Sequence, residues 1–283
     1  MGKNTLFSEE AKKINLTVDE RDILHAQLVS YMEYHPLYLS VPQSRLRSFG
    51  QQTKHSIMSF GAQLVRSHKR PRYMVVNGED KEANRYLMLP VEHVLPFALH
   101  AVPFDTSEKG GHFTFDSIPI TVHFPGEFSL ANALAAATLM FAMGTPSQTI
   151  ARGIDSLSRI AGRAEEIREG QPFPVLVDYA HTPDSLRALY GAFPNRRKIC
   201  VLGSTGGGRD LWKRPVMGGV ADEYCDAIIL TNEDPYDEDP RSIVDGIAQG
   251  ITVHTPEIIM DRRAAIQRAL SLARASDVVL ITG

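Results

Sequence analysis

The 283-residue chain has little of what marks a secreted, membrane or nucleic-acid-binding protein. Its two cysteines, Cys200 and Cys225, lie in or beside apolar segments, so we expect buried thiols of a cytoplasmic protein, not a disulfide or a metal pair. No apolar run approaches the roughly 20 residues that span a bilayer, and residues 1–13 lack the apolar core of a signal peptide. The net charge of −3 gives no sign of the excess of basic residues that binds nucleic acid or a membrane surface.

The second half of the chain alternates between apolar runs and helical patterns, which predicts an α/β fold with a mainly parallel sheet. The apolar runs read as buried strands: Val175–Val177, Ile199–Leu202, Ala227–Leu230 and Val278–Ile281. The helical patterns between and after them cover about Pro183–Phe193, Pro215–Tyr224, Pro240–Gln249 and Asp261–Ala275. The length allows one large domain or two ordinary ones.

The first half is less regular. We predict a strand at Tyr73–Val76 and a β-hairpin that joins Phe113–Phe115 to Ile118–His123. Ser129 is placed to cap an alanine-rich helix. The polar stretch that follows Gly162 suggests a domain boundary there.

A strand delivers three chemically useful side chains to the start of a helix. Asp178, Tyr179 and His181 follow the run Val175–Val177, and they precede Thr182, which can cap a helix, and Pro183, which fits its first position. Open α/β sheets bind ligands at such strand ends. A well-capped turn with a solvated Asp and His is the alternative.

Three further polar segments follow predicted strands. The run Gly203–Asp210 contains three consecutive glycines, which allow a ligand to approach the backbone, although a flexible loop would read the same way. Lys213 and Arg214 stand just before a predicted helix, where a cation is locally unfavourable and therefore suggests a function. The run Glu233–Asp239 is rich in carboxylates, which in most proteins marks a solvated turn.

In their order and spacing, these motifs resemble the Mur ligases, enzymes that build the peptide stem of peptidoglycan, and within them the MurE branch, the UDP-N-acetylmuramoyl-tripeptide synthetases. The resemblance rests on Asp178–Asp184, Gly207–Asp210, Lys213–Pro215 and Glu233–Pro240, and on Gly126–Ala133 upstream. It implies a partial central, ATP-binding domain in residues 1–161, with residues 1–70 poorly assigned. A Rossmann-like C-terminal domain, truncated at its end, then occupies residues 162–283.

The resemblance also implies roles for individual residues. The ATP side would be formed by Asn132, at the adenine, and by Arg163, Tyr179 and His181. The substrate side would be formed by Arg209, which grips the carboxylate of the incoming amino acid, with Arg214, Glu233, Asp234 and Tyr236. The catalytic residues would be Asp178, His181 and Lys213. We assign no metal ligand, and we take His35 as a surface histidine.

The implied reaction is an ATP-dependent amide ligation in cell-wall biosynthesis. ATP, with Mg²⁺, phosphorylates the free carboxylate of UDP-MurNAc-L-Ala-D-Glu, and the amine of an amino acid attacks the acyl phosphate. The resemblance implies a cytoplasmic monomer that acts on small molecules. Tyr236 stands where an Arg accompanies diaminopimelate in the family, which favours a lysine-like amino acid.

The chain also departs from the family pattern in the segment that would hold the ATP phosphates. It contains no G-x-x-G-K-[ST] phosphate loop, so we expect a fragment that shows no ligase turnover by itself. A folylpolyglutamate synthase or a cyanophycin-type ligase is an alternative within the same family. A non-catalytic nucleotide- or peptide-binding α/β protein is an alternative of a different class.

Overall fold

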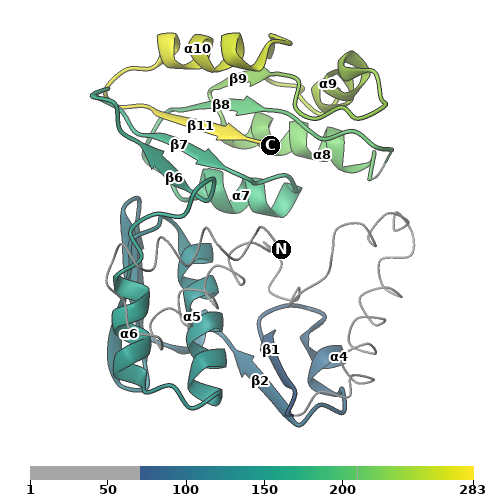
Figure 1. The fold of residues 1–283 in the computed structure, drawn as a ribbon. Helices are drawn as coiled ribbons and strands as arrows, with labels where there is room; N and C mark the ends of the chain where they lie inside the picture. The colour runs from purple at the N-terminus through teal and green to yellow at the C-terminus, as the bar shows by residue number, and fades with distance from the viewer. Residues whose placement is uncertain (1–70, 209) are drawn as a thin grey trace, which may run out of the picture. The chain divides into compact units, whose positions relative to one another are not determined.

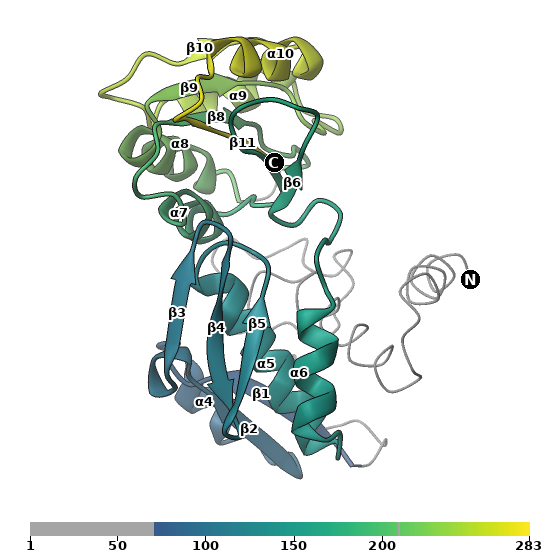
Figure 2. The same ribbon diagram turned by 90° about the vertical axis from the view of Figure 1, so that its left-hand side faces the viewer.

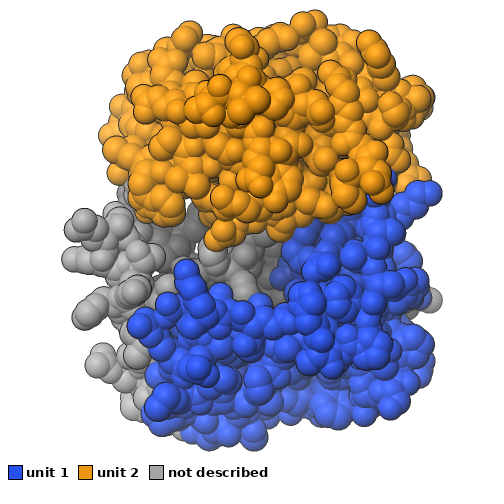
Figure 3. All heavy atoms as spheres, turned by 180° about the vertical axis from the view of Figure 1, so that it is seen from behind, with its two compact units in different colours: residues 1–158 blue, residues 159–283 orange. Residues whose placement is uncertain are grey.

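The computed structural model describes residues 71–208 and 210–283, so the expectations for residues 1–70, His35 among them, and for Arg209 lie outside the described residues. The chain divides into two compact units, residues 1–158 and 159–283 (Figure 3). The described part of the first unit contains two small sheets, and the second unit contains one sheet of six strands. Among the helices of the described residues, none is both long enough and apolar enough to cross a bilayer.

In the first unit, the alanine-rich helix α5 (Glu127–Ala142) packs against both small sheets (Figure 2). One sheet is a parallel pair, β1 (Tyr73–Asn77) and β2 (His93–Phe97), and the other is antiparallel, β3 (Phe104–Ser107), β4 (Gly110–Phe115) and β5 (Ile118–Val122). The remaining elements are α4 (Ala83–Leu87), the short 3₁₀ helix η2 (Leu99–Ala101) and α6 (Ser147–Asp155). Buried alanines on α5 leave room for the close approach of its neighbours.

The strand predicted at Tyr73 and the hairpin are confirmed. Asp116 and Ser117 form the two-residue turn of the hairpin, and their φ angles of 49° and 64° fit a type I′ turn. The predicted cap at Ser129 is wrong. The helix begins at Glu127, with Gly126 at the cap position, and the hydroxyl of Ser129 instead donates to the carbonyl of Pro125 at 2.7 Å.

The six strands of the second unit lie in the order β10-β9-β8-β11-β7-β6. They are β6 (Glu165–Ile167), β7 (Val175–Asp178), β8 (Lys198–Leu202), β9 (Ala227–Leu230), β10 (Glu257–Ile258) and β11 (Val278–Thr282). All neighbours pair in parallel except β6, which is antiparallel to β7. The mainly parallel sheet and its four predicted strands are therefore confirmed, whereas β6 and β10 were not predicted.

Helices cover both faces of this sheet. They are α7 (Pro183–Gly191), α8 (Lys213–Tyr224), α9 (Pro240–Ala248) and α10 (Arg262–Leu272). Figure 1 shows α10 on one side of the sheet and α7 and α8 on the other. Ala265 and Ala269 of α10 pack into the core formed by the central strands. Because β7, β8, β9 and β11 run in the same direction, their carboxyl ends meet at one edge, where such sheets bind ligands.

The expectation of two free thiols is wrong. Cys200, in β8, and Cys225, which ends α8, are both buried, as expected, but they form a disulfide. Their Cα atoms lie 6.2 Å apart, within the range that a disulfide can bridge. A separation of 25 residues in the sequence does not reveal that the end of α8 returns to the middle of β8.

Candidate functional site

The turn after β7 is held by the cap that the sequence predicts. Thr182 caps α7: its hydroxyl accepts from the amide of Ser185 at 3.2 Å, and the hydroxyl of Ser185 accepts from the amide of Thr182 at 3.1 Å. This reciprocal pair satisfies two amides that the first turn of a helix leaves without intrahelical partners. Pro183 occupies the start of α7, as predicted.

Asp178 ends β7 with its carboxylate turned to the backbone. Its side chain is only 2 % exposed. One oxygen accepts from the amide of Ala180 at 2.7 Å, and the other accepts from the amide of Ala164 at 2.6 Å. These bonds tie the turn after β7 to the segment before β6. The carboxylate therefore fixes the backbone on which Tyr179 and His181 stand.

Arg163, Tyr179 and His181, three of the residues predicted on the ATP side, come together. The guanidinium of Arg163 lies 4.7 Å from the centroid of the Tyr179 ring, and the Tyr179 and His181 rings lie 4.8 Å apart. The Nδ1 atom of His181 lies 2.9 Å from the carbonyl oxygen of Tyr179. Tyr179 is exposed, His181 is half-buried and Arg163 is buried. An exposed ring beside a cation and a second ring forms a surface on which a planar ligand group can stack.

The glycine-rich loop after β8 is docked on the acidic loop after β9. The amide of Gly206 donates to the carbonyl of Asp234 at 2.8 Å, and a Cβ atom on Gly206 would lie only 2.0 Å from the carbonyl oxygen of Pro235. Tyr236, at a φ of 50°, places its ring 3.6 Å from the position of a Cβ on Gly207. Glycine is therefore required at position 206, and the two loops act as one surface.

Glu238 fastens this surface to α8. Its carboxylate accepts from the amide of Gly208, and its Oε2 lies 2.9 Å from the Nη2 of Arg214. The Gly208 amide and then the Arg214 guanidinium hold the pKa of Glu238 below its usual range. Arg214 is only 6 % exposed and its guanidinium is paired with Glu238, so its predicted place on the substrate side stays a prediction. Glu238 was not among the residues predicted for the site.

Glu233 is the half-buried carboxylate of the acidic loop. Burial raises the pKa of Glu233, against the opposing fields of Arg262 and Lys213, while Asp234 adds to the rise. Lys213 is the first residue of α8, which begins two residues earlier than predicted. Asp234 and Tyr236 are exposed. A partly desolvated carboxylate beside an exposed one suits the binding of an ammonium group.

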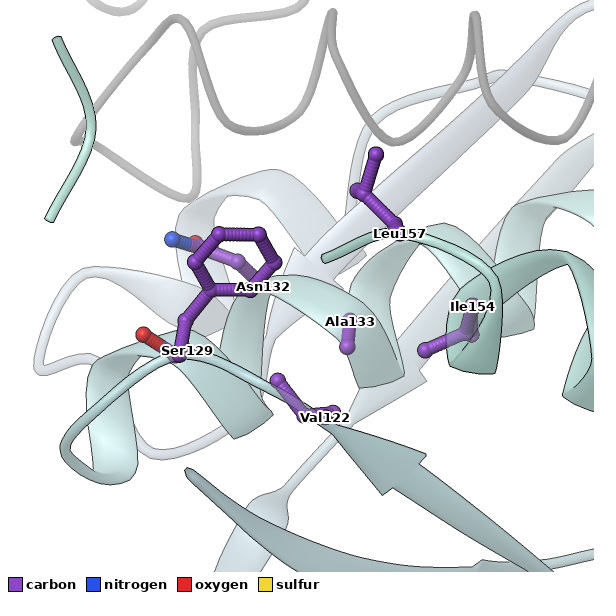
Figure 4. Close-up of a pocket in the computed structure, with 7 residues that line it drawn as sticks. Val122, Ser129, Asn132, Ala133, Ile154 and Leu157 are labelled. Atoms are coloured by element: carbon purple, nitrogen blue, oxygen red, sulfur yellow. The ribbon is translucent and has the colours of Figure 1, made fainter. Parts of the chain in front are cut away.

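Asn132 lies in the first unit, in a pocket at the side of α5. The pocket is lined by Val122, Phe124, Ser129, Asn132, Ala133, Ile154 and Leu157. Figure 4 shows the polar ends of Ser129 and Asn132 on one side and Ile154 and Leu157 on the other. The predicted contact of Asn132 with an adenine stays a prediction. Within residues 71–208 and 210–283, no group of three or more His, Cys, Asp or Glu side chains could hold a metal ion.

Known proteins resemble this chain in sequence and in fold. Residues 162–283 match the family model described as Mur ligase, glutamate ligase domain. The chain is 33% identical over 248 residues to the UDP-N-acetylmuramoyl-L-alanyl-D-glutamate–2,6-diaminopimelate ligase of Bacillus cereus, over 82% of this chain and 50% of that protein. It therefore spans about half the length of the curated relatives it matches.

Two solved structures share its fold at low sequence identity. The structure of MurF from Acinetobacter baumannii aligns with a TM-score of 0.66 at 16% identity, covering 91% of this chain and 58% of that one. The folylpolyglutamate synthase of Mycobacterium tuberculosis aligns with a TM-score of 0.65 at 17% identity, covering 87% and 57%. At these identities the likeness is one of fold alone.

Proposed function

Because this chain belongs to the Mur ligase family, we propose that it serves an ATP-dependent ligation that joins an amino acid to the free carboxylate of a UDP-muramoyl dipeptide. The reaction proceeds through an acyl phosphate that the amine of the amino acid attacks, and it contributes to peptidoglycan synthesis. The observation that carries the proposal is the match over residues 162–283, together with the gathering of charged and aromatic side chains at the carboxyl edge of the same sheet.

The amino acid binds, in this proposal, at the docked loops after β8 and β9. Glu233 and Asp234 take its side-chain ammonium, Tyr236 covers it, and Arg209, by the resemblance, takes its α-carboxylate. A planar guanidinium binds a carboxylate through two parallel hydrogen bonds. Lysine and diaminopimelate share the side-chain ammonium and differ in a second carboxylate.

The nucleotide side uses the other predicted residues. By the resemblance, Asn132 of the first unit is assigned to the adenine. In the second unit, the stack of Arg163, Tyr179 and His181 offers a surface for a planar or charged group of a ligand. Asp178 acts by fixing the turn that carries Tyr179 and His181. Mg²⁺, when bound with ATP, screens the charge of the phosphates.

Two further residues complete the assignment. Lys213 lies at the start of α8, where an anion is favoured, and we assign it to the transferred phosphoryl group. Arg214 reaches the muramoyl substrate only if its pair with Glu238 opens, because both groups are held together in the described structure. The likeness to folylpolyglutamate synthase is one of fold, so no specific observation favours a folate substrate.

The proposal is tested by titrating the ¹⁵N-labelled chain with lysine, with diaminopimelate and with ATP and Mg²⁺, following backbone amides by NMR. We expect either amino acid to shift the amides of Gly206 and Asp234, and ATP to shift those near Asn132. Glu233→Gln should abolish the shifts caused by the amino acids and keep those caused by ATP. A chain that responds to none of the three ligands would contradict the proposal.

A further inference from the structure

Arg262 stands where a helix disfavours a positive charge. It is the first residue of α10, whose start is capped by Asp261 through a hydrogen bond from the amide of Ala264. A cation at this end opposes the helix dipole. Arg262 is also half-buried, and burial lowers the pKa of its guanidinium. Its Nη2 donates to the carbonyl of Thr282, at the end of β11, at 3.2 Å. A locally unfavourable choice of this kind implies a compensating interaction elsewhere.

The compensating group is Glu233, which lies beside Arg262 at the backbone of Gly203. A Cβ atom placed on Gly203 would lie 3.0 Å from the Cβ of Glu233 and 3.4 Å from the Nη1 of Arg262. A side chain at position 203 would therefore occupy the space beside both groups. The Oε2 of Glu233 lies 3.5 Å from the position of a Cβ on Gly283, which places the carboxylate between the ends of β8 and β11.

Each of the two charged groups has one buried atom with an unsatisfied hydrogen-bonding capacity. The Nη1 of Arg262 and the Oε2 of Glu233 are both buried, and within residues 71–208 and 210–283 neither has a hydrogen-bond partner. A buried polar atom left in this state is costly, and two such atoms of opposite charge beside one glycine can satisfy each other after a small side-chain rotation. The other charges that act on Glu233 are Lys213 of α8 and Asp234 of its own loop.

We propose that Arg262 is a positioning residue that keeps Glu233 ionised and in place for the ammonium group of the amino acid. The proposal rests on the proposed function only for the identity of the ligand. Arg262 acts through Glu233 and does not itself need to touch the amino acid, because its Nη1 is closed to solvent. Without Arg262, a half-buried carboxylate would take up a proton more readily and lose its hold on an ammonium group.

The first test measures the pKa of the Glu233 carboxyl in the chain by ¹³C NMR, with Glu233→Gln used to assign the signal. We expect Arg262→Met to raise this pKa by about one unit, a tenfold change in the ionisation constant. Arg262→Lys should restore most of the difference, because it keeps the charge. Arg263→Met is the matched control: it removes an exposed charge from the next residue of the same helix and should leave the pKa of Glu233 unchanged.

The second test measures the affinity of the same variants for lysine and for diaminopimelate between pH 6 and pH 8.5. Arg262→Met should weaken binding more at the acid end than at the alkaline end, by at most the tenfold that a shift of about one unit allows, since Glu233 is ionised at the alkaline end in either protein. A general structural defect would weaken binding equally at every pH. If the unaltered chain binds neither amino acid, the proposed function fails, and the first test still decides the role of Arg262.

Two outcomes would overturn the inference. The first is that Glu233 has the same pKa in Arg262→Met as in the unaltered chain. The other applies if Arg262→Met does not fold. In that case we expect the double variant Arg262→Met, Glu233→Gln to fold, because it removes both charges, and a double variant as unstable as the single one would show that the two groups do not interact.

Discussion

Replacing Glu238 with Gln should loosen the docked loops and destabilise the second unit. The side chain of Glu238 is 22 % exposed and that of its partner Arg214 is 7 % exposed, with 2.9 Å between their charged atoms. Removing one member of a fully buried pair costs about 3–5 kcal/mol, so for this partly exposed carboxylate we expect a loss of about 2–3 kcal/mol. The amide of Gly208 also loses a charged acceptor.

The assay is urea unfolding followed by tryptophan fluorescence. Trp212 is the only tryptophan of the chain and it stands directly before α8, so its emission reports on this unit. Asp237→Asn is the matched control, an exposed carboxylate in the same loop that should change the free energy of unfolding by less than about 0.5 kcal/mol. Equal losses for the two variants, or a loss for Glu238→Gln below about 0.5 kcal/mol, would refute the assignment of Glu238 as the anchor of the loops.

Three further changes have expected outcomes. Asp222→Asn should cost about 2 kcal/mol in urea unfolding at pH 7, because its carboxylate accepts from three successive backbone amides at 2.7–2.9 Å. These amides and the His254 side chain outweigh burial and lower the pKa of Asp222. The contribution of Asp222 to the free energy of unfolding is therefore full above the unfolded pKa of about 4 and fades as pH falls towards the lower folded pKa. The variant should lose less stability on acidification. Replacing Cys200 and Cys225 with Ala together should cost about 3 kcal/mol or more, from the loop of 25 residues that the disulfide closes, and equal unfolding midpoints with and without a reductant would contradict this. Gly203→Ala should weaken amino-acid binding by about tenfold, since its Cβ would lie 3.1 Å from a carbonyl as well as beside Glu233, whereas the control Gly219→Ala, with its nearest neighbour at 3.6 Å, should not.

The sequence predicts the central strands well because strands that are buried on both faces consist of apolar residues throughout. Ile199–Leu202 and Val278–Ile281 are apolar on both faces, which only a covered parallel strand explains. The edge strands escape the same reasoning. Glu165–Ile167 is charged, and Glu257–Ile258 is two residues long and only partly buried. Their place in the sheet depends on the neighbouring strand and not on their own pattern.

The site is predicted in part for similar reasons. The capped turn at Thr182 follows from local rules and is confirmed. Glu238 could not be singled out, because nothing in the carboxylate run Glu233–Asp239 shows which side chain turns towards Arg214. Arg262 carried a usable signal, a cation in the first turn of a predicted helix, and the same reasoning that selected Lys213 would have found it.

The central claim is that the carboxyl edge of the second unit is an amino-acid site built around Glu233. It is tested most directly by isothermal titration calorimetry of the chain with lysine and with diaminopimelate, beside norleucine, which lacks a side-chain ammonium. The account predicts that one or both diamino acids bind at least about tenfold more tightly than norleucine, and that Glu233→Gln removes this preference, a difference of about 1.4 kcal/mol or more. Equal affinity for norleucine and the diamino acids, or a preference that survives Glu233→Gln, would contradict it.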